Sequence, residues 1–187
     1  MSERLPTVRT EIDPEILEHP TLGFLRDYWQ AKRGSRTLPS RADIRASDLK
    51  EHLGWVLLLD VLPGGRDFRY RLIGTLVTQY WLQDSTGKTV SEAFEESGPI
   101  VQQSILSVFR KCVRDRCVVR THGDAGWLPG GFEKFDSIYM PLAEDGDTPT
   151  HILHAFVFDK PEVMLARQIA RANGGKLLEV PVKKPAA

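Results

Sequence analysis

Two histidines three residues apart, His151 and His154, are the most obvious candidate metal ligands in the sequence. On a helix, this H-x-x-H spacing would place both imidazole rings on one face. The surrounding segment, HILHAFVF, is rich in β-branched and aromatic residues and favours a strand, on which positions three apart point to opposite faces. The remaining histidines, which form no group with ligand spacing, are His19, His52 and His122. We therefore expect no metal site.

A nucleophile, a base and an acid occur close together at Cys117, His122 and Asp124. Cys117 and His122 are five residues apart on one predicted strand, so they face opposite sides and cannot form a catalytic pair. The glycine-rich segment 123–131 lacks the lysine and the strand–loop–helix context of a phosphate-binding loop. We assign no catalytic residue.

The stretch from Trp55 to Lys88 predicts a hairpin followed by a short helix. The second strand of this hairpin alternates, which places Phe68, Tyr70 and Leu72 on one face. Gly74 and Thr75 then end the strand and begin the helix. The predicted elements are a strand at Trp55–Val61, a Pro-Gly-Gly turn at 63–65, a strand at Phe68–Ile73 and a helix at Leu76–Trp81.

Further helices and strands are predicted on both sides of this hairpin. Upstream, Thr21 is the expected N-cap of a helix that Gly34 ends. Downstream, the last strand is apolar on both faces, which places it in the interior of a sheet. These elements are helices at Thr21–Arg33 and Pro99–Arg114 and strands at Cys117–His122, Phe132–Leu142 and His151–Phe158. We divide the chain into an N-terminal helical extension (1–53), a core domain (54–159) and a C-terminal helix at Lys160–Ala172 with a disordered tail (160–187).

Composition narrows the class of protein. The 187 residues contain 25 Lys and Arg against 25 Asp and Glu, so the net charge is zero and a dedicated nucleic-acid binder is not expected. No apolar run approaches the roughly 20 residues that span a membrane. The N-terminus has no signal-type apolar core, and the only cysteines are Cys112 and Cys117. We expect a cytoplasmic protein with free thiols.

Four short segments occur in the order and spacing of a known domain family: Leu38–Ile44 (LPSRADI), Arg69–Thr75 (RYRLIGT), Asp84–Lys88 (DSTGK) and Tyr139–Leu142 (YMPL). With the order of elements, they resemble the PAS fold over residues 22–158, and more narrowly the stand-alone bacterial type known as PAS family 5. Gln83 departs from the glycine usual there. The resemblance implies an α+β fold with a five-stranded antiparallel sheet and short helices on one face. It also implies a sensory or interaction module without enzymatic activity or a fixed ligand.

A PAS-like sheet offers a pocket between its concave face and the helices. The resemblance implies that haem would be held by a helix histidine and that flavin photosensing would use a cysteine in an Asn-Cys-Arg-like motif. The helix 99–114 contains no histidine, and Cys112 lies on the apolar stripe of that helix, so both cofactors are disfavoured. The candidate ligand-binding residues are Tyr70, Trp81, Phe109, Tyr139 and His154 as walls and Ser137 as a polar group. The alternative is that these side chains simply fill the core.

Two function classes remain. The favoured one is a sensory or regulatory module that binds a signalling protein, forms a homodimer and responds to a small ligand. For the dimer interface we expect one face of the N-terminal helix, namely Leu22, Leu25, Tyr28 and Trp29. The alternative is a small-molecule enzyme or binding protein with a cone-shaped pocket of the ketosteroid-isomerase kind, using Asp136 with Tyr139. These two residues are three apart on a strand and face opposite sides, which weakens that alternative.

Overall fold

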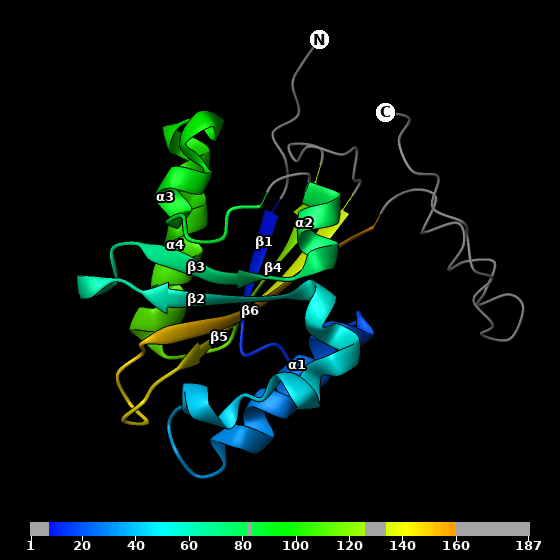
Figure 1. Cartoon of the computed structure of the whole chain (residues 1–187), viewed down its shortest axis with the longest axis vertical. Coiled ribbons are helices and arrows are strands. Elements are labelled where there is room, and N and C mark those ends of the chain that lie inside the picture. Colours follow the sequence, from blue (N-terminus) through cyan, green and yellow to red (C-terminus); the bar gives the residue numbers. More distant parts are fainter. Residues whose placement is uncertain (1–7, 82–83, 126–133, 160–187) are drawn as a thin grey trace, which may run out of the picture.

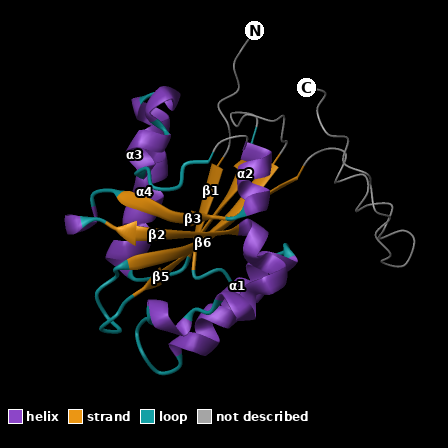
Figure 2. Cartoon of the chain, viewed as in Figure 1, coloured by secondary structure: helices purple, strands orange, loops and turns teal. Residues whose placement is uncertain are grey.

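Six antiparallel strands form one sheet in the order β1-β4-β5-β6-β2-β3 (Figures 1 and 2). The structure is a computed structural model that describes residues 8–81, 84–125 and 134–159. The predicted α+β class is confirmed, and the doubly apolar β6 lies inside the sheet, between β5 and β2, as expected. The strands are β1 (Val8–Ile12), β2 (Val56–Val61), β3 (Phe68–Ile73), β4 (Val119–Asp124), β5 (Lys134–Leu142) and β6 (His151–Asp159).

The prediction of five strands is wrong, because β1 adds a sixth at the edge of the sheet. This strand pairs with β4, from Val8 opposite Gly123 to Ile12 opposite Val119. Its segment, VRTEI, alternates over only five positions, and none of these residues is buried, so it carries little of the pattern by which a half-buried strand is recognised. The N-terminal segment is therefore part strand and part helix.

The helices surround the sheet. The first helix begins at Pro20, and its N-cap is His19, whose ring accepts a hydrogen bond from the Thr21 N–H; the prediction of Thr21 as the cap is wrong by two positions. Gly34, with a φ of 57°, ends this helix as predicted. The helices are α1 (Pro20–Arg33), α2 (Thr75–Trp81), α3 (Val90–Ala93) and α4 (Pro99–Asp115), with 3-10 turns at Arg41–Asp43, Ala46–Trp55, Pro63–Gly65 and Glu95–Ser97. The predicted helix at 160–172 lies outside the described residues.

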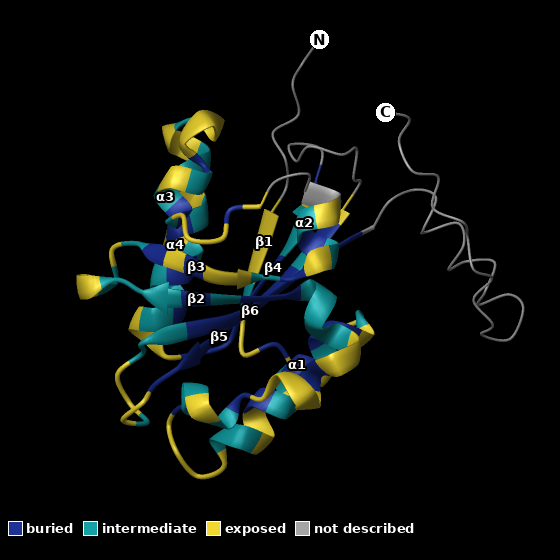
Figure 3. Ribbon diagram, in the orientation of Figure 1, coloured by how far each residue is buried: buried dark blue, intermediate teal, exposed yellow. Residues whose placement is uncertain are grey.

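The central strands are buried on both faces of the sheet, because helices pack against each face (Figure 3). Alternate residues of the central strands therefore enter two separate apolar clusters. On the first, termed the α4 face, the cluster includes Leu57, Leu59, Phe68, Phe109, Tyr139, Ile152 and Phe156. On the second, termed the α1 face, it includes Leu22, Leu25, Trp29, Ile138, Met140, Leu153 and Ala155.

The docking of α1 corrects the predicted dimer interface. Leu22 and Leu25 are fully buried in the α1 face, and Trp29 is buried there with its indole N–H donating to the Pro141 carbonyl at 2.9 Å. Tyr28 is half-buried, and its hydroxyl donates to Asp48 at 3.0 Å. The first three side chains belong to the core of a single chain and cannot contact a second copy while α1 stays docked. The homodimer itself stays a prediction.

A β-bulge in the hairpin of β2 and β3 reverses one predicted side chain. Leu58 pairs with Leu72, but the next residue, Leu59, pairs with Tyr70, so Arg71 is the extra residue. Phe68 and Tyr70 are buried as predicted, whereas Leu72 is turned outward and exposed. The strict alternation expected from the sequence therefore holds only up to the bulge.

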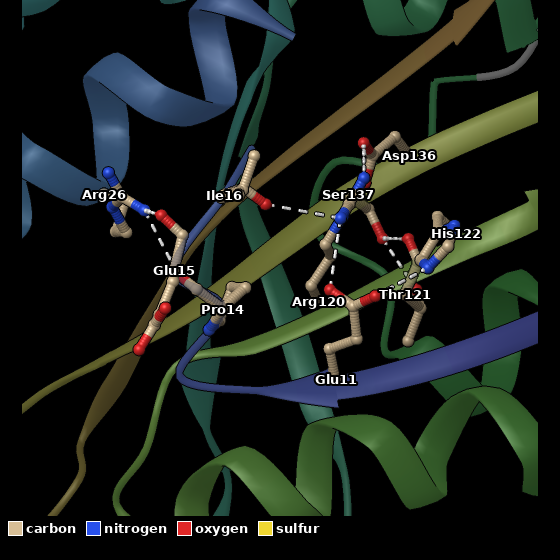
Figure 4. Close-up of polar contacts among 10 residues, drawn as sticks. All are labelled: Glu11, Pro14, Glu15, Ile16, Arg26, Arg120, Thr121, His122, Asp136 and Ser137. Atoms are coloured by element: carbon tan, nitrogen blue, oxygen red, sulfur yellow. Dashed lines mark hydrogen bonds and ion pairs between the residues drawn. The ribbon is translucent and has the colours of Figure 1, made fainter. Parts of the chain in front are cut away.

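A buried arginine fastens the N-terminal segment to the sheet (Figure 4). Arg120 on β4 is 9% exposed and donates two hydrogen bonds to Asp136 on β5, at 2.9 and 2.8 Å. It also donates to the carboxylate of Glu11 on β1 at 3.1 Å and to the Ile16 carbonyl at 3.4 Å. The hydrogen bond with Asp136 raises the pKa of Arg120 against the opposing effect of burial, so the guanidinium stays charged. One side chain thus joins β1, β4, β5 and the segment between β1 and α1.

We expect Arg120→Met to destabilise the chain by about 3 kcal/mol, because it leaves the Asp136 carboxylate half-buried without its partner. The double variant Arg120→Met/Asp136→Leu should recover most of this loss, since it removes both charges together. Urea denaturation of Arg120→Met, Asp136→Leu and the double variant measures the coupling energy between the two side chains.

Arg114→Met is the matched control, because Arg114 also pairs with a carboxylate, Asp115, but is 71% exposed. A loss of stability in this control equal to that in Arg120→Met would contradict a special role for the buried pair.

Candidate functional site

Three hydroxyl groups meet in the interior, on the α4 face of β4 and β5. Thr121 lies opposite Ser137 in the strand register, and their side-chain oxygens are 2.8 Å apart. The Tyr139 hydroxyl lies 3.5 Å from the Thr121 oxygen and 3.4 Å from that of Ser137. All three side chains are buried. We term Thr121, Ser137 and Tyr139 the hydroxyl cluster.

His154 on β6 lies directly opposite Tyr139, and the two rings stack with centroids 4.2 Å apart and planes 12° apart. Phe109 of α4 approaches both rings edge-on, at 4.9 Å from Tyr139 and 5.7 Å from His154. His154 is only 3% exposed, yet neither ring nitrogen has a hydrogen-bond partner among the described residues. Burial lowers the pKa of His154 to about 3, so the ring is neutral near pH 7. A neutral imidazole with one free donor and one free acceptor therefore faces the interior.

The two tyrosines of the α4 face are also held neutral. Burial raises the pKa of Tyr139, although hydrogen bonds with Ser137 and Thr121 act in the opposite direction. Burial, with a smaller contribution from Tyr139, raises the pKa of Tyr70 still further. The interior therefore offers hydroxyl donors and acceptors and an imidazole, and these carry no charge near pH 7.

Most of the predicted ligand-binding residues lie on this one face. Phe109, Tyr139 and His154 contact one another directly, Ser137 lies within the hydroxyl cluster, and Tyr70 packs in the same apolar cluster. The backbone of Trp81 ends α2, but its side chain lies outside what the structure describes. Their role in binding a ligand stays a prediction, because these contacts are also those of a packed core.

Sequence reasoning missed Thr121. This residue joins the cluster only because β4 and β5 pair in the register that sets it opposite Ser137. The only signal in the sequence was the occurrence of hydroxyl residues on two neighbouring predicted strands, and the register cannot be read from that pattern.

The structure does not assemble the alternative enzyme site. Asp136 projects to the α1 face, where it is paired with Arg120 at 2.8 Å, whereas Tyr139 projects to the α4 face. Cys112 is fully buried on the inner side of α4, and burial raises the pKa of its thiol well above the usual value. It is a core residue, as its helical spacing predicted.

Within residues 8–81, 84–125 and 134–159, three or more His, Cys, Asp or Glu side chains nowhere come together as a metal site would require. Among the helices described, none has the length and apolar character needed to cross a membrane.

The family model of PAS family 5, described as a PAS domain, matches residues 17–157. The chain belongs to the PAS domain family. No curated protein matches the sequence. Among solved structures, the chain is similar to one described as "Structure of an RNA-binding Light-Oxygen-Voltage Receptor", with 13% sequence identity and a TM-score of 0.47. The alignment covers 90% of this chain and 44% of that one, so this chain spans less than half the length of that receptor.

Membership of the PAS family confirms the resemblance seen in the sequence and supports a role in sensing and signal transduction. The match begins before α1 and ends within β6. The docked helix α1 therefore lies inside the PAS match, together with the strands on which it packs.

The unpartnered His154 predicts a specific pH dependence of stability. The pKa of this residue is about 3 in the folded chain against 6.5 for the free side chain, so between these values the unfolded chain binds the extra proton. The free energy of unfolding is therefore unaffected by this titration well above pH 6.5. It falls as the pH is lowered, by about 2 kcal/mol between pH 7 and pH 5. Urea denaturation across this range measures it.

His154→Phe is the informative variant, because it keeps an aromatic ring on Tyr139 while removing both unsatisfied nitrogens. At pH 7 we expect it to be at least as stable as the natural chain, with a smaller loss of stability toward pH 5. An unchanged pH dependence in this variant would show that His154 is not the titrating group.

Proposed function

We propose that the protein is a sensory and regulatory PAS module, without catalytic activity, that acts through contacts with other proteins and responds to a small ligand on its α4 face. The observation that carries this proposal is His154, which is 3% exposed and has two unpaired ring nitrogens. An unsatisfied buried polar group costs roughly 1–3 kcal/mol, whereas an apolar ring of similar shape would cost nothing of the kind. A ligand that hydrogen-bonds to the imidazole would remove this cost.

The chemistry around His154 selects the class of ligand. The hydroxyl cluster of Thr121, Ser137 and Tyr139 supplies further donors and acceptors close to the ring. The surrounding walls are apolar and aromatic, which is the usual composition of a small-molecule site. The described interior near these groups presents no counter-charge, so a charged ligand would be heavily penalised. The expected ligand is small, uncharged and mostly apolar, with one or two polar groups.

Binding would have to move a ring. Phe109 packs edge-on against both Tyr139 and His154, so a ligand that reaches the imidazole must displace the Phe109 side chain. Phe109 belongs to α4, whose opposite side is exposed to solvent. Displacement of this ring would shift α4 and so change the surface that a signalling partner contacts. A ligand can bias that surface only by binding the two positions of α4 with different affinity.

Native mass spectrometry of the full chain, purified without denaturant, tests the ligand. We expect a small molecule bound to the natural chain, and a lower occupancy in Ser137→Ala, which removes one hydroxyl of the cluster. Ser104→Ala is the matched control, since Ser104 is an exposed serine on α4.

Equal occupancy in the two variants would place the molecule elsewhere on the chain. Turnover of a small metabolite by the purified chain, abolished by Tyr139→Phe, would overturn the proposal in favour of an enzyme.

For the homodimer, we propose a revised contact on the outer side of α1. Phe24 is 38% exposed and stacks on His52 with ring centroids 4.2 Å apart, while Tyr28 lies beside it at 6.1 Å. An aromatic group that remains accessible on a docked helix suits contact with a second copy related by a twofold axis.

Phe24→Glu should therefore shift the chain from dimer to monomer, as measured by light scattering after size exclusion at high micromolar concentration. Its fold should be preserved, because Phe24 is outside both buried clusters. Leu72→Glu, which charges an exposed leucine on β3, is the control and should leave the mass unchanged. A natural chain that is monomeric under these conditions would exclude the dimer.

A further inference from the structure

A second site is suggested by a cavity of about 140 Å³ on the opposite side of the sheet from the hydroxyl cluster. It lies beside the C-terminal half of α1, where this helix faces the segments that follow β1 and α4. Three arginines line it: Arg26 and Arg33 on α1, and Arg116 just after α4. The one acidic residue in its described lining is Asp13. Three guanidinium groups therefore line the cavity against one carboxylate, while Asp27 and Asp147, outside the lining, pair with Arg26 and Arg116.

Arg33, which lines this cavity, has an unused donor. Its guanidinium lies over the Trp29 ring, 5.5 Å from the ring centre, which is a cation–π contact. Its Nε is fully buried and has no hydrogen-bond partner among the described residues. A buried guanidinium N–H without an acceptor is unfavourable, and a small rotation of the Arg33 side chain toward the cavity would let an oxygen atom of a bound anion satisfy it.

The other two arginines differ in how firmly they are held. Arg26 is fixed, because it donates to the carbonyls of Pro14 and Glu15 at 3.1 and 2.6 Å (Figure 4) and to the carboxylate of Asp27 at 2.7 Å. Among the described residues, Arg116 pairs with Asp147 at 3.3 Å, and both side chains are largely exposed, at 47% and 58%. Such an exposed pair contributes little, so the Arg116 side chain is free to exchange Asp147 for another anion.

The backbone at the rim is held in an unusual conformation. In the described part of the chain, the non-glycine residues with positive φ are Asp13, at 44°, and Arg116, at 52°, and both line this cavity. This region is disfavoured for residues with a side chain and persists where surrounding contacts enforce it. At Asp13 that contact is visible, since its carboxylate accepts the Val118 N–H at 3.0 Å. The carboxylate is thereby held by the backbone amide.

We propose that this cavity binds a small oxyanion, with Arg33 and Arg116 as the binding residues and Arg26 as a fixed positive charge. The shared chemistry is a phosphoryl or carboxylate group, because the guanidinium fork matches both. A water molecule occupies about 30 Å³ of liquid, so the cavity has room for one such group with little around it, and not for a nucleotide. The bound anion would link α1 to the end of α4, two helices on opposite faces of the sheet.

The test is a titration of the full chain with inorganic phosphate and, separately, with acetate, each against sodium chloride at matched ionic strength. Calorimetry should show saturable binding of at least one oxyanion, weakened at least about tenfold by Arg33→Gln, which corresponds to a loss of roughly 1.4 kcal/mol. Tighter binding of phosphate assigns the site to phosphoryl groups, and tighter binding of acetate assigns it to carboxylates. Chloride binding as strong as that of either oxyanion would overturn the proposal.

The matched control is Arg69→Gln, which removes the same charge from β3 at the far edge of the sheet. If Arg69→Gln weakens oxyanion binding as much as Arg33→Gln does, the loss reflects net charge alone and the proposal is overturned. If Arg33→Gln fails to fold, Arg116→Gln replaces it, and the Arg33 Nε–H resonance of the natural chain gives a second readout. That resonance should change its chemical shift on titration with the anion that binds. No change with either phosphate or acetate would also overturn the proposal.

Discussion

The burial of the central strands on both of their faces is the constraint on which the rest of the structure depends. In β6, Ile152, His154 and Phe156 enter the α4 face, while Leu153 and Ala155 enter the α1 face. A strand of this kind requires cover on each side, so the N-terminal helix cannot be an appendage. It completes the core, and the PAS match that includes it agrees with that role. Arg120 acts at the same junction, because it ties β1 to the pair β4 and β5.

The sequence was informative where local pattern and burial agree. The doubly apolar run of β6 and the helical stripe of α4 predicted both elements and their positions. It was uninformative where tertiary pairing decides. No side chain of β1 is buried, so its pairing with β4 is what makes it a strand. The expected alternation of β3 holds as far as Tyr70, and the bulge at Arg71 then turns Leu72 outward. Thr121 enters the hydroxyl cluster through strand register, which residue types do not specify.

The two proposed sites have opposite electrostatic character, and the sheet separates them. On the α4 face, neutral groups lie among aromatic rings, and burial holds the pKa of His154 low and that of Tyr139 high. On the other side of the sheet, three arginines line a cavity that opens toward solvent, and Arg26 donates a hydrogen bond to the backbone carbonyl of Pro14. The same alternation that divides the core into two clusters also places Asp136 beside Arg120, away from Tyr139. A carboxylate and a phenol that are near neighbours in sequence therefore serve different sides of the protein.

The contact between β1 and β4 also bears on how the chain is made. Glu11 and Arg120 are 109 residues apart in sequence, and the strand face that receives α1 comes from β5 and β6, which are synthesised still later. At roughly 5–20 residues per second, the ribosome would leave the N-terminal helix without its binding surface for on the order of ten seconds. Throughout that interval Leu22, Leu25 and Trp29 have no apolar partner on the sheet. The apolar side of α1 therefore stays exposed on the nascent chain until β5 and β6 have been made.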